Sequence, residues 1–206
     1  MFVYCLNNPI CRIDLYGNVS EEAAKEKIEE NKEEIIAAGK EFNVDPAIIA
    51  ACIYVEQVLN VNWMDSLSDL LCYSFDTSIG IGQVRVSTAI LVEDNGYMEQ
   101  SQGFYANQLY ISREEVVATT LADDKANIRY VAAYLAYWQD RWSDTLDISN
   151  MPEILGTLYN LGDNANEPNT SPKSNSFGRH VGVAYGMMKM LLYKRVGNRG
   201  VQYEIN

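Results

Sequence analysis

The feature that most constrains the fold is an almost wholly apolar stretch from Ala47 to Glu56. Asp45 and Pro46 precede it, and a capping acceptor followed by proline at the first helical position is typical of a helix start. A helix with apolar residues on most of its surface is typical of a buried core element. We therefore expect a core helix that begins near Asp45 and ends at Glu56.

Glu56 is the candidate catalytic residue of this predicted helix. Cys52 and Ile53 would lie one turn before it, and Ile48 and Ile49 two turns before. A carboxylate beside an apolar stripe is poorly solvated, which favours the protonated form and raises its pKa. An acid kept protonated near neutral pH can serve as the general acid in glycosidic bond cleavage. The alternative is that Glu56 points to solvent at the last helical turn, as charged residues mostly do.

Composition excludes several function classes. A chain of 206 residues fits one domain, with or without a short appendage. The formal net charge of −12 argues against a nucleic-acid or anionic-membrane surface, because phosphate binding needs clustered Lys and Arg. No stretch is apolar for long enough to span a bilayer, and the first residues lack the basic start of a signal peptide. We therefore expect no membrane insertion, and any export by another route.

Metal and cofactor chemistry has little support in the sequence. The four cysteines show no metal spacing: Cys52 and Cys72 are interpreted as core residues, and Cys5 and Cys11 could pair only if the amino terminus folds back. The single histidine, His180, has no neighbours at triad or zinc-ligand spacing. We predict neither a metal nor another cofactor.

The remaining patterns predict a mainly α domain with a small β or loop excursion around residues 74–84. Residues 1–18 are turn-rich and are predicted to form a strand and turns. A polar loop is expected over 163–176. Further helices are expected from Ser20 through Lys40, over 66–73, from Ser87 or Thr88 to Val92, after Ser112, after Asp123 or Asp124, over 154–161, and from Phe177 to about Val196.

Three polar segments follow the predicted acid. In the segment 78–84, Gly80 and Gly82 let the backbone approach a ligand closely, and the amide of Gln83 can both donate and accept hydrogen bonds. Tyr159 and Asn160 supply an aromatic ring and an amide at the end of a short helix, and Phe177-Gly178-Arg179 opens the last one. Each pattern alone is common in turns and helix ends, but their order is more specific.

That order, over roughly residues 40–195, resembles the goose-type lysozyme and soluble lytic transglycosylase superfamily. The family cleaves the β-1,4 bond between N-acetylmuramic acid and N-acetylglucosamine. Its acid closes a core helix, usually as Glu-Ser, and here the pair is Glu56-Gln57. Its Gly-Leu-Met-Gln segment corresponds in position to 80–83, and its Ala-Tyr-Asn-Ala-Gly segment resembles 158–162.

The resemblance implies a lysozyme-like fold in which Glu56 is the catalytic acid and peptidoglycan glycan strands are the substrate. It implies that Tyr159 is the partner of the acid. The substrate-binding residues it implies are Gly82, Gln83, Tyr159 and Asn160. A non-catalytic module that only binds glycan or a partner is the alternative, because a fold does not dictate a function.

A second carboxylate would decide the products. An inverting hydrolase needs one about 6.5–9.5 Å from the acid to hold a water. Goose-type lysozymes have an aspartate shortly before the Gly-rich segment, and Asp76 is similarly placed here, better than Asp65 or Asp69. We therefore predict a hydrolytic muramidase in which Asp76 positions the water. If Asp76 only caps a turn, the alternative is a lytic transglycosylase that yields 1,6-anhydro products.

Residues 1–18 carry a second resemblance. The segments 4–9 (YCLNNP) and 13–17 (IDLYG) are similar to the end of the core domain of Rhs/YD-repeat polymorphic toxins. This implies a remnant of the toxin core over 1–18 and a toxic catalytic domain over 19–206. It also implies delivery to the envelope of a competing bacterium, and a cognate immunity protein as a partner. A turn-rich start that arose by chance is the alternative.

Overall fold

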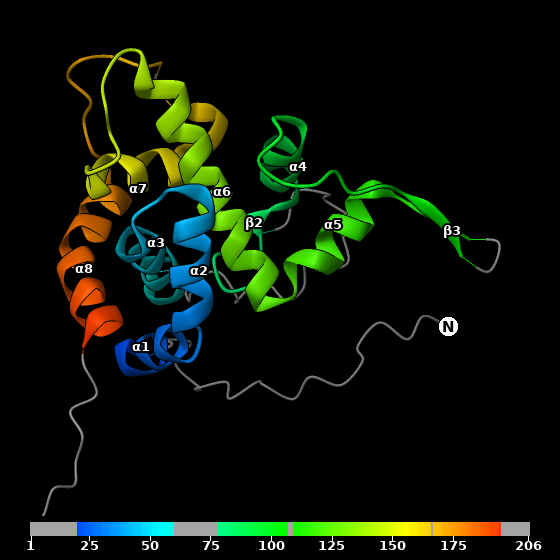
Figure 1. The fold of residues 1–206 in the computed structure, drawn as a ribbon, viewed down its shortest axis with the longest axis horizontal. Coiled ribbons are helices and arrows are strands. Elements are labelled where there is room, and N and C mark those ends of the chain that lie inside the picture. Colours follow the sequence, from blue (N-terminus) through cyan, green and yellow to red (C-terminus); the bar gives the residue numbers. More distant parts are fainter. Residues whose placement is uncertain (1–19, 60–77, 107–108, 166, 195–206) are drawn as a thin grey trace, which may run out of the picture.

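The computed structural model describes residues 20–59, 78–106, 109–165 and 167–194. The expected mainly α domain with a small β excursion is confirmed in these ranges (Figure 1). The elements are α1 Glu21–Glu30, α2 Lys32–Phe42, α3 Pro46–Leu59, β1 Ser78–Ile79, β2 Val84–Arg85, α4 Val86–Asp94, β3 Phe104–Ala106, β4 Leu109–Ile111, α5 Arg113–Leu121, α6 Asp124–Ser143, α7 Pro152–Leu161, a 3-10 turn Gly162–Asn164 and α8 Ser176–Tyr193. None of these helices combines the length and apolarity needed to cross a membrane.

Some of the predicted features lie outside the described residues. These are the segment 1–18, the predicted helix over 66–73, the carboxylates Asp65, Asp69 and Asp76, and the cysteines Cys5, Cys11 and Cys72. The domain boundary after residue 18 therefore stays a prediction.

Helix α3 is the central element of the fold. All residues from Ala47 to Glu56 are buried, because α1, α2, α6, α7 and α8 all pack against this helix. Its start at Pro46 is as predicted, with Asp45 Oδ1 accepting a hydrogen bond from Ala47 N. The helix continues to Leu59 rather than ending at Glu56, so the acid lies inside its last turn.

The predicted first helix is wrong in one respect, because it is two helices. Ser20 caps α1 as expected, accepting a bond from Ala23 N. The helix then breaks at Asn31, whose side-chain amide donates to Lys27 O. This local bond competes with helix continuation, as Asn side chains often do. Helix α2 ends at Phe42 and is capped by Asn43, which has the left-handed conformation at φ 54°.

The caps of α5 and α6 agree with the prediction, whereas the start of α4 and the end of α8 differ from it. Ser112 forms the expected capping box with Glu115, and Asp123 caps α6. Neither Ser87 nor Thr88 caps α4, because β2 runs directly into this helix and Arg85 occupies the capping position. Helix α8 ends at Tyr193, earlier than predicted.

A hairpin that was not predicted from the sequence extends away from the helices (Figure 1). Strands β3 and β4 pair antiparallel, with Phe104 opposite Ile111. Four large side chains on it are exposed: Phe104, Tyr105, Leu109 and Tyr110. Residues 104–111 combine aromatic and branched side chains around a polar pair, which is a hairpin pattern.

Candidate active site

Glu56 lies almost completely buried in the last turn of α3, with 7% of its surface exposed. Burial raises the pKa of this carboxyl to about 8, although the positive charge of Arg85 partly opposes the shift. Arg85 is exposed at the end of β2. Glu56 is therefore mostly protonated at neutral pH, which is the state that a general acid needs.

Residues 79–82, from the end of β1 into the turn before β2, are here called the 79–82 turn. This turn is held by the adjacent Gln83 and by three side chains from distant parts of the chain. Four successive carbonyl oxygens of this turn accept hydrogen bonds: Ile79 from Asn127 Nδ2 at 2.8 Å, Gly80 from Gln83 Nε2 at 2.9 Å, Ile81 from Gln57 Nε2 at 2.6 Å and Gly82 from the Tyr159 hydroxyl at 2.6 Å. Because Gln57 follows Glu56 directly, this turn is tied to the last turn of α3.

The glycines of this turn bring its backbone against α6. Gly80 has φ 76°, a conformation that suits glycine. A Cβ at Gly80 would collide with the amide of Asn127, and one at Gly82 would collide with Val131. We expected these glycines to let backbone approach a ligand, whereas the close approach that the structure shows is to α6. Both the N–H and the carbonyl of Gly82 are bonded within the protein.

The side chain of Gln83, expected to bind substrate, donates to the carbonyl of Gly80 within its own turn. Gln83 is partly exposed and has φ 52°, an uncommon conformation for a residue with a side chain. Its role in substrate binding stays a prediction.

Tyr159 and Asn160 follow each other on α7 but have different surroundings. Burial, followed by the charge of Glu56, raises the pKa of Tyr159 well above its ordinary value, so this phenol lies within electrostatic range of the acid. Its hydroxyl donates to the carbonyl of Gly82. Asn160 is exposed, and its Oδ1 accepts a bond from Asn175, the residue that caps α8. The structure thus joins Tyr159 to Gly82 by a hydrogen bond and places it within electrostatic range of Glu56. Gln83 directly follows Gly82, and Asn160 is tied to the start of α8.

Asn127, a completely buried amide on α6, was not predicted as part of the site. The sequence feature that could have revealed Asn127 is its position: it is a polar residue inside a predicted helix, between the cap Asp123 and the inward-facing Ile128. Gln57 and Arg85 were also missed as parts of the site, because their contacts depend on a turn whose position only the fold determines.

No group of three or more potential metal ligands (His, Cys, Asp or Glu) occurs among the residues that the structure describes.

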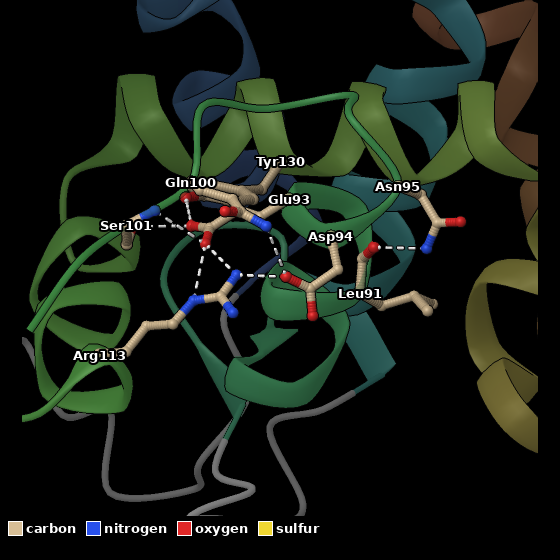
Figure 2. A network of polar contacts seen from close by, with 8 residues as sticks. All are labelled: Leu91, Glu93, Asp94, Asn95, Gln100, Ser101, Arg113 and Tyr130. Atoms are coloured by element: carbon tan, nitrogen blue, oxygen red, sulfur yellow. Dashed lines mark hydrogen bonds and ion pairs between the residues drawn. The ribbon is translucent and has the colours of Figure 1, made fainter.

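A second buried carboxylate, Glu93, lies in a network of polar contacts (Figure 2) that includes Ser101, which precedes β3, and Arg113, which follows β4. It accepts hydrogen bonds from both the N–H and the hydroxyl of Ser101, from Arg113 at 2.8 Å and from Tyr130 at 2.7 Å. Burial would raise the pKa of Glu93, but the bonds from Tyr130, Arg113 and Ser101 outweigh it and hold this pKa below its usual value. Glu93 is therefore a charged structural anchor, unlike Glu56.

Comparison with known proteins assigns this arrangement to a class. A family model described as "T6SS, Peptidoglycan muramidase Tse3, catalytic domain" matches residues 13–140. The chain therefore belongs to this family of peptidoglycan muramidase catalytic domains. A relative, the peptidoglycan muramidase Tse3 of Pseudomonas aeruginosa, is 32% identical over 147 residues, which are 68% of this chain and 34% of the relative. The chain thus spans about a third of the length of that relative.

The matched range has two consequences for the predicted site. It contains Glu56, the 79–82 turn and Asn127, whereas Tyr159 and Asn160 lie beyond its end. It begins at residue 13, inside the segment that resembles the toxin core, and that second resemblance stays a prediction.

Proposed function

We propose that this domain cleaves the β-1,4 bond between N-acetylmuramic acid and N-acetylglucosamine, with Glu56 as the general acid. The observation that carries the proposal is the burial that raises the pKa of Glu56 to about 8. The protonated carboxyl donates its proton to the glycosidic oxygen while the bond from that oxygen to the sugar carbon breaks. The family match supports peptidoglycan as the substrate.

The other predicted site residues have supporting roles in this proposal. Gln83, partly exposed beside the 79–82 turn, and Asn160, exposed at the end of α7, offer amides to the N-acetyl groups of the sugar. Tyr159 keeps the backbone of Gly82 in place, and Gly82 contributes through its close packing against α6 rather than through free backbone groups.

For the second half of the reaction we propose hydrolysis, with Asp76 holding the attacking water. The support is the position of Asp76 before the 79–82 turn in the sequence. Mass spectrometry of the products tests this step. Reducing-end muramic acid that is lost in Asp76→Asn supports it, whereas anhydro-muropeptides that are unchanged in Asp76→Asn identify a transglycosylase.

In its biological setting, we propose that the domain acts as an antibacterial toxin. The support is the family description, which names a T6SS muramidase. The proposal includes delivery to the target cell envelope and a cognate immunity protein that protects the producing cell. It also includes the interpretation of residues 1–18 as a remnant of an Rhs-type core.

The test is cleavage of purified peptidoglycan sacculi by the full 206-residue chain, followed by turbidity and by mass spectrometry of the soluble products. We expect wild type to release muropeptides and Glu56→Gln to release none, with an unchanged circular dichroism spectrum. Glu167→Gln makes the same chemical change at a carboxylate that is 81% exposed, and should keep full activity. Wild-type protein that binds sacculi without releasing muropeptides would leave the non-catalytic binding module as the function.

A further inference from the structure

Asn127 makes three hydrogen bonds that require an amide. Its Oδ1 accepts from Gly82 N at 2.8 Å, and its Nδ2 donates to the carbonyl oxygens of Ile79 at 2.8 Å and Leu121 at 2.9 Å. A carboxylate cannot donate to the two carbonyls, and an aliphatic side chain can neither donate nor accept. Because Asn127 is completely buried, water cannot replace a lost bond without entering the core. The buried amide is therefore matched to this one arrangement of the turn.

The 79–82 turn needs such support because its own hairpin is short. Strands β1 and β2 have two residues each, so few ladder hydrogen bonds hold them. Gly80 at φ 76° and Gln83 at φ 52° are both in the left-handed region, which costs free energy at a residue with a side chain. Side chains from α3, α6 and α7 supply the hydrogen bonds that the short hairpin lacks.

The position of this turn affects the surroundings of Glu56. The titratable groups near the acid include Arg85, Tyr159 and Cys52. Arg85 ends the strand that follows the turn, and Tyr159 is bonded to the turn at Gly82. A displaced turn would therefore move Arg85 and release Tyr159, and would change how much water reaches the acid.

We propose that Asn127 is a positioning residue for the reaction: it fixes the 79–82 turn, and through this turn the groups that surround Glu56. Asn127 acts through the backbone and takes no proton itself. The inference rests on the proposed function, because it concerns the efficiency of the same acid.

The test compares Asn127→Leu with Tyr130→Phe in the full chain, using soluble glycan strands so that kcat and KM can be measured separately across pH. Tyr130 lies one turn further along α6, is also buried, and donates to Glu93 rather than to the turn. It therefore controls for the loss of a buried hydrogen bond on the same helix. We expect Asn127→Leu to lower kcat about 10- to 100-fold, because small displacements around the reacting groups have effects of this order.

A second readout separates positioning from stability. In Asn127→Leu the pH above which activity falls should move to lower values, because a loosened turn admits water to Glu56. Burial influences this pKa more than the opposing charge of Arg85 does, so the loss of burial outweighs a displacement of Arg85 and the pKa falls. Tyr130→Phe should keep the wild-type kcat and the wild-type pH profile. Because stability itself depends on pH, the assays are run well below the melting temperature of each variant at every pH, so that loss of stability does not move the profile.

The outcomes distinguish the two proposals. A wild-type chain that does not cleave glycan overturns the proposed function. An active wild type with Asn127→Leu matching Tyr130→Phe in kcat and pH profile, or losing kcat with an unmoved profile, overturns the positioning role. If Asn127→Leu does not fold, Asn127→Ala decides by the same two readouts, since it removes the same three bonds and leaves room for water beside the backbone groups.

Discussion

The two buried glutamates, Glu56 and Glu93, have pKa values that shift in opposite directions, because hydrogen bonds outweigh burial at Glu93 whereas burial is the largest influence at Glu56. Glu93 has donors from a backbone amide, a hydroxyl, a phenol and a guanidinium, which stabilise its charge in spite of burial. At Glu56 burial is the largest influence on the pKa, and the exposed Arg85 only partly compensates it. Carboxyls whose pKa is raised by burial, like that of Glu56, are typical of acid catalysts.

We predict that activity on peptidoglycan is lost as the pH rises through about 8. A general acid must be protonated, so the fraction of active enzyme falls above the pKa of Glu56, which is about 8. The measurement is kcat/KM on soluble glycan strands between about pH 5 and about pH 10, which reports the pKa of the free enzyme. A profile that already falls near the acid end of this range would show that another group controls the rate.

We predict that Tyr159→Phe weakens activity less than Glu56→Gln does. The phenylalanine removes the hydrogen bond to the carbonyl of Gly82 but leaves the proton donor intact, whereas loss of a general acid costs about 10²- to 10⁴-fold. Rates of muropeptide release by the two variants, measured side by side, check the order. Equal losses would contradict this order and would mean that the Tyr159 hydroxyl matters to the reaction as much as the proton donor does.

At the scale of elements, the helix caps were predictable and the support of the turn was not. Ser20, Ser112 and Asp123 act on backbone groups within three residues, so local sequence determines them. The bonds from Gln57, Asn127 and Tyr159 to the 79–82 turn join residues 24, 48 and 77 positions apart, and depend on how α3, α6 and α7 pack. The burial of Glu56 could be predicted because its apolar stretch is continuous in sequence.

We predict that Gly82→Ala destabilises the protein by about 1–3 kcal/mol, the usual cost of overpacking. The added methyl group would collide with Val131 on α6. Gly186→Ala is the matched control: it lies within α8, where an added Cβ would meet open space, and should stabilise by about 0.5–1 kcal/mol because alanine is the better helix former. Urea denaturation of both variants checks the opposite signs. A Gly82→Ala variant of wild-type stability would show that α6 can move aside.

At the scale of the whole molecule, charge and burial together determine how stability depends on pH. The folded pKa of Glu56 lies above its usual value of 4.5, so stability falls as the pH rises from 4.5 to about 8. The folded pKa of Glu93 lies below 4.5, so its contribution is full above that value and is lost as the pH falls. The net charge of −12 adds self-repulsion at neutral pH.

We therefore predict that thermal stability is greatest near about pH 5. Glu56→Gln should raise the melting temperature at about pH 8 and change it little at about pH 5, because it removes the cost of a buried charge. Glu93→Gln should lower the melting temperature at about pH 7 and flatten the loss on the acid side. Melting curves of the three proteins from about pH 3 to about pH 9 check these directions. An unchanged alkaline side in Glu56→Gln would contradict the assignment of the raised pKa.

Because the contacts of Glu93 lie outside the β3–β4 hairpin, we expect that this hairpin can be replaced without loss of the fold. Ser101 before β3 and Arg113 after β4 bind the same carboxylate, and Phe104 pairs with Ile111, so the two ends of the hairpin meet at one point. Replacement of residues 104–111 by a short glycine linker would therefore leave the contacts of Glu93 in place. We expect the shortened protein to keep its cooperative melting, which differential scanning calorimetry measures. The reason is that Glu93, Arg113 and Tyr130 belong to α4, α5 and α6 rather than to the hairpin.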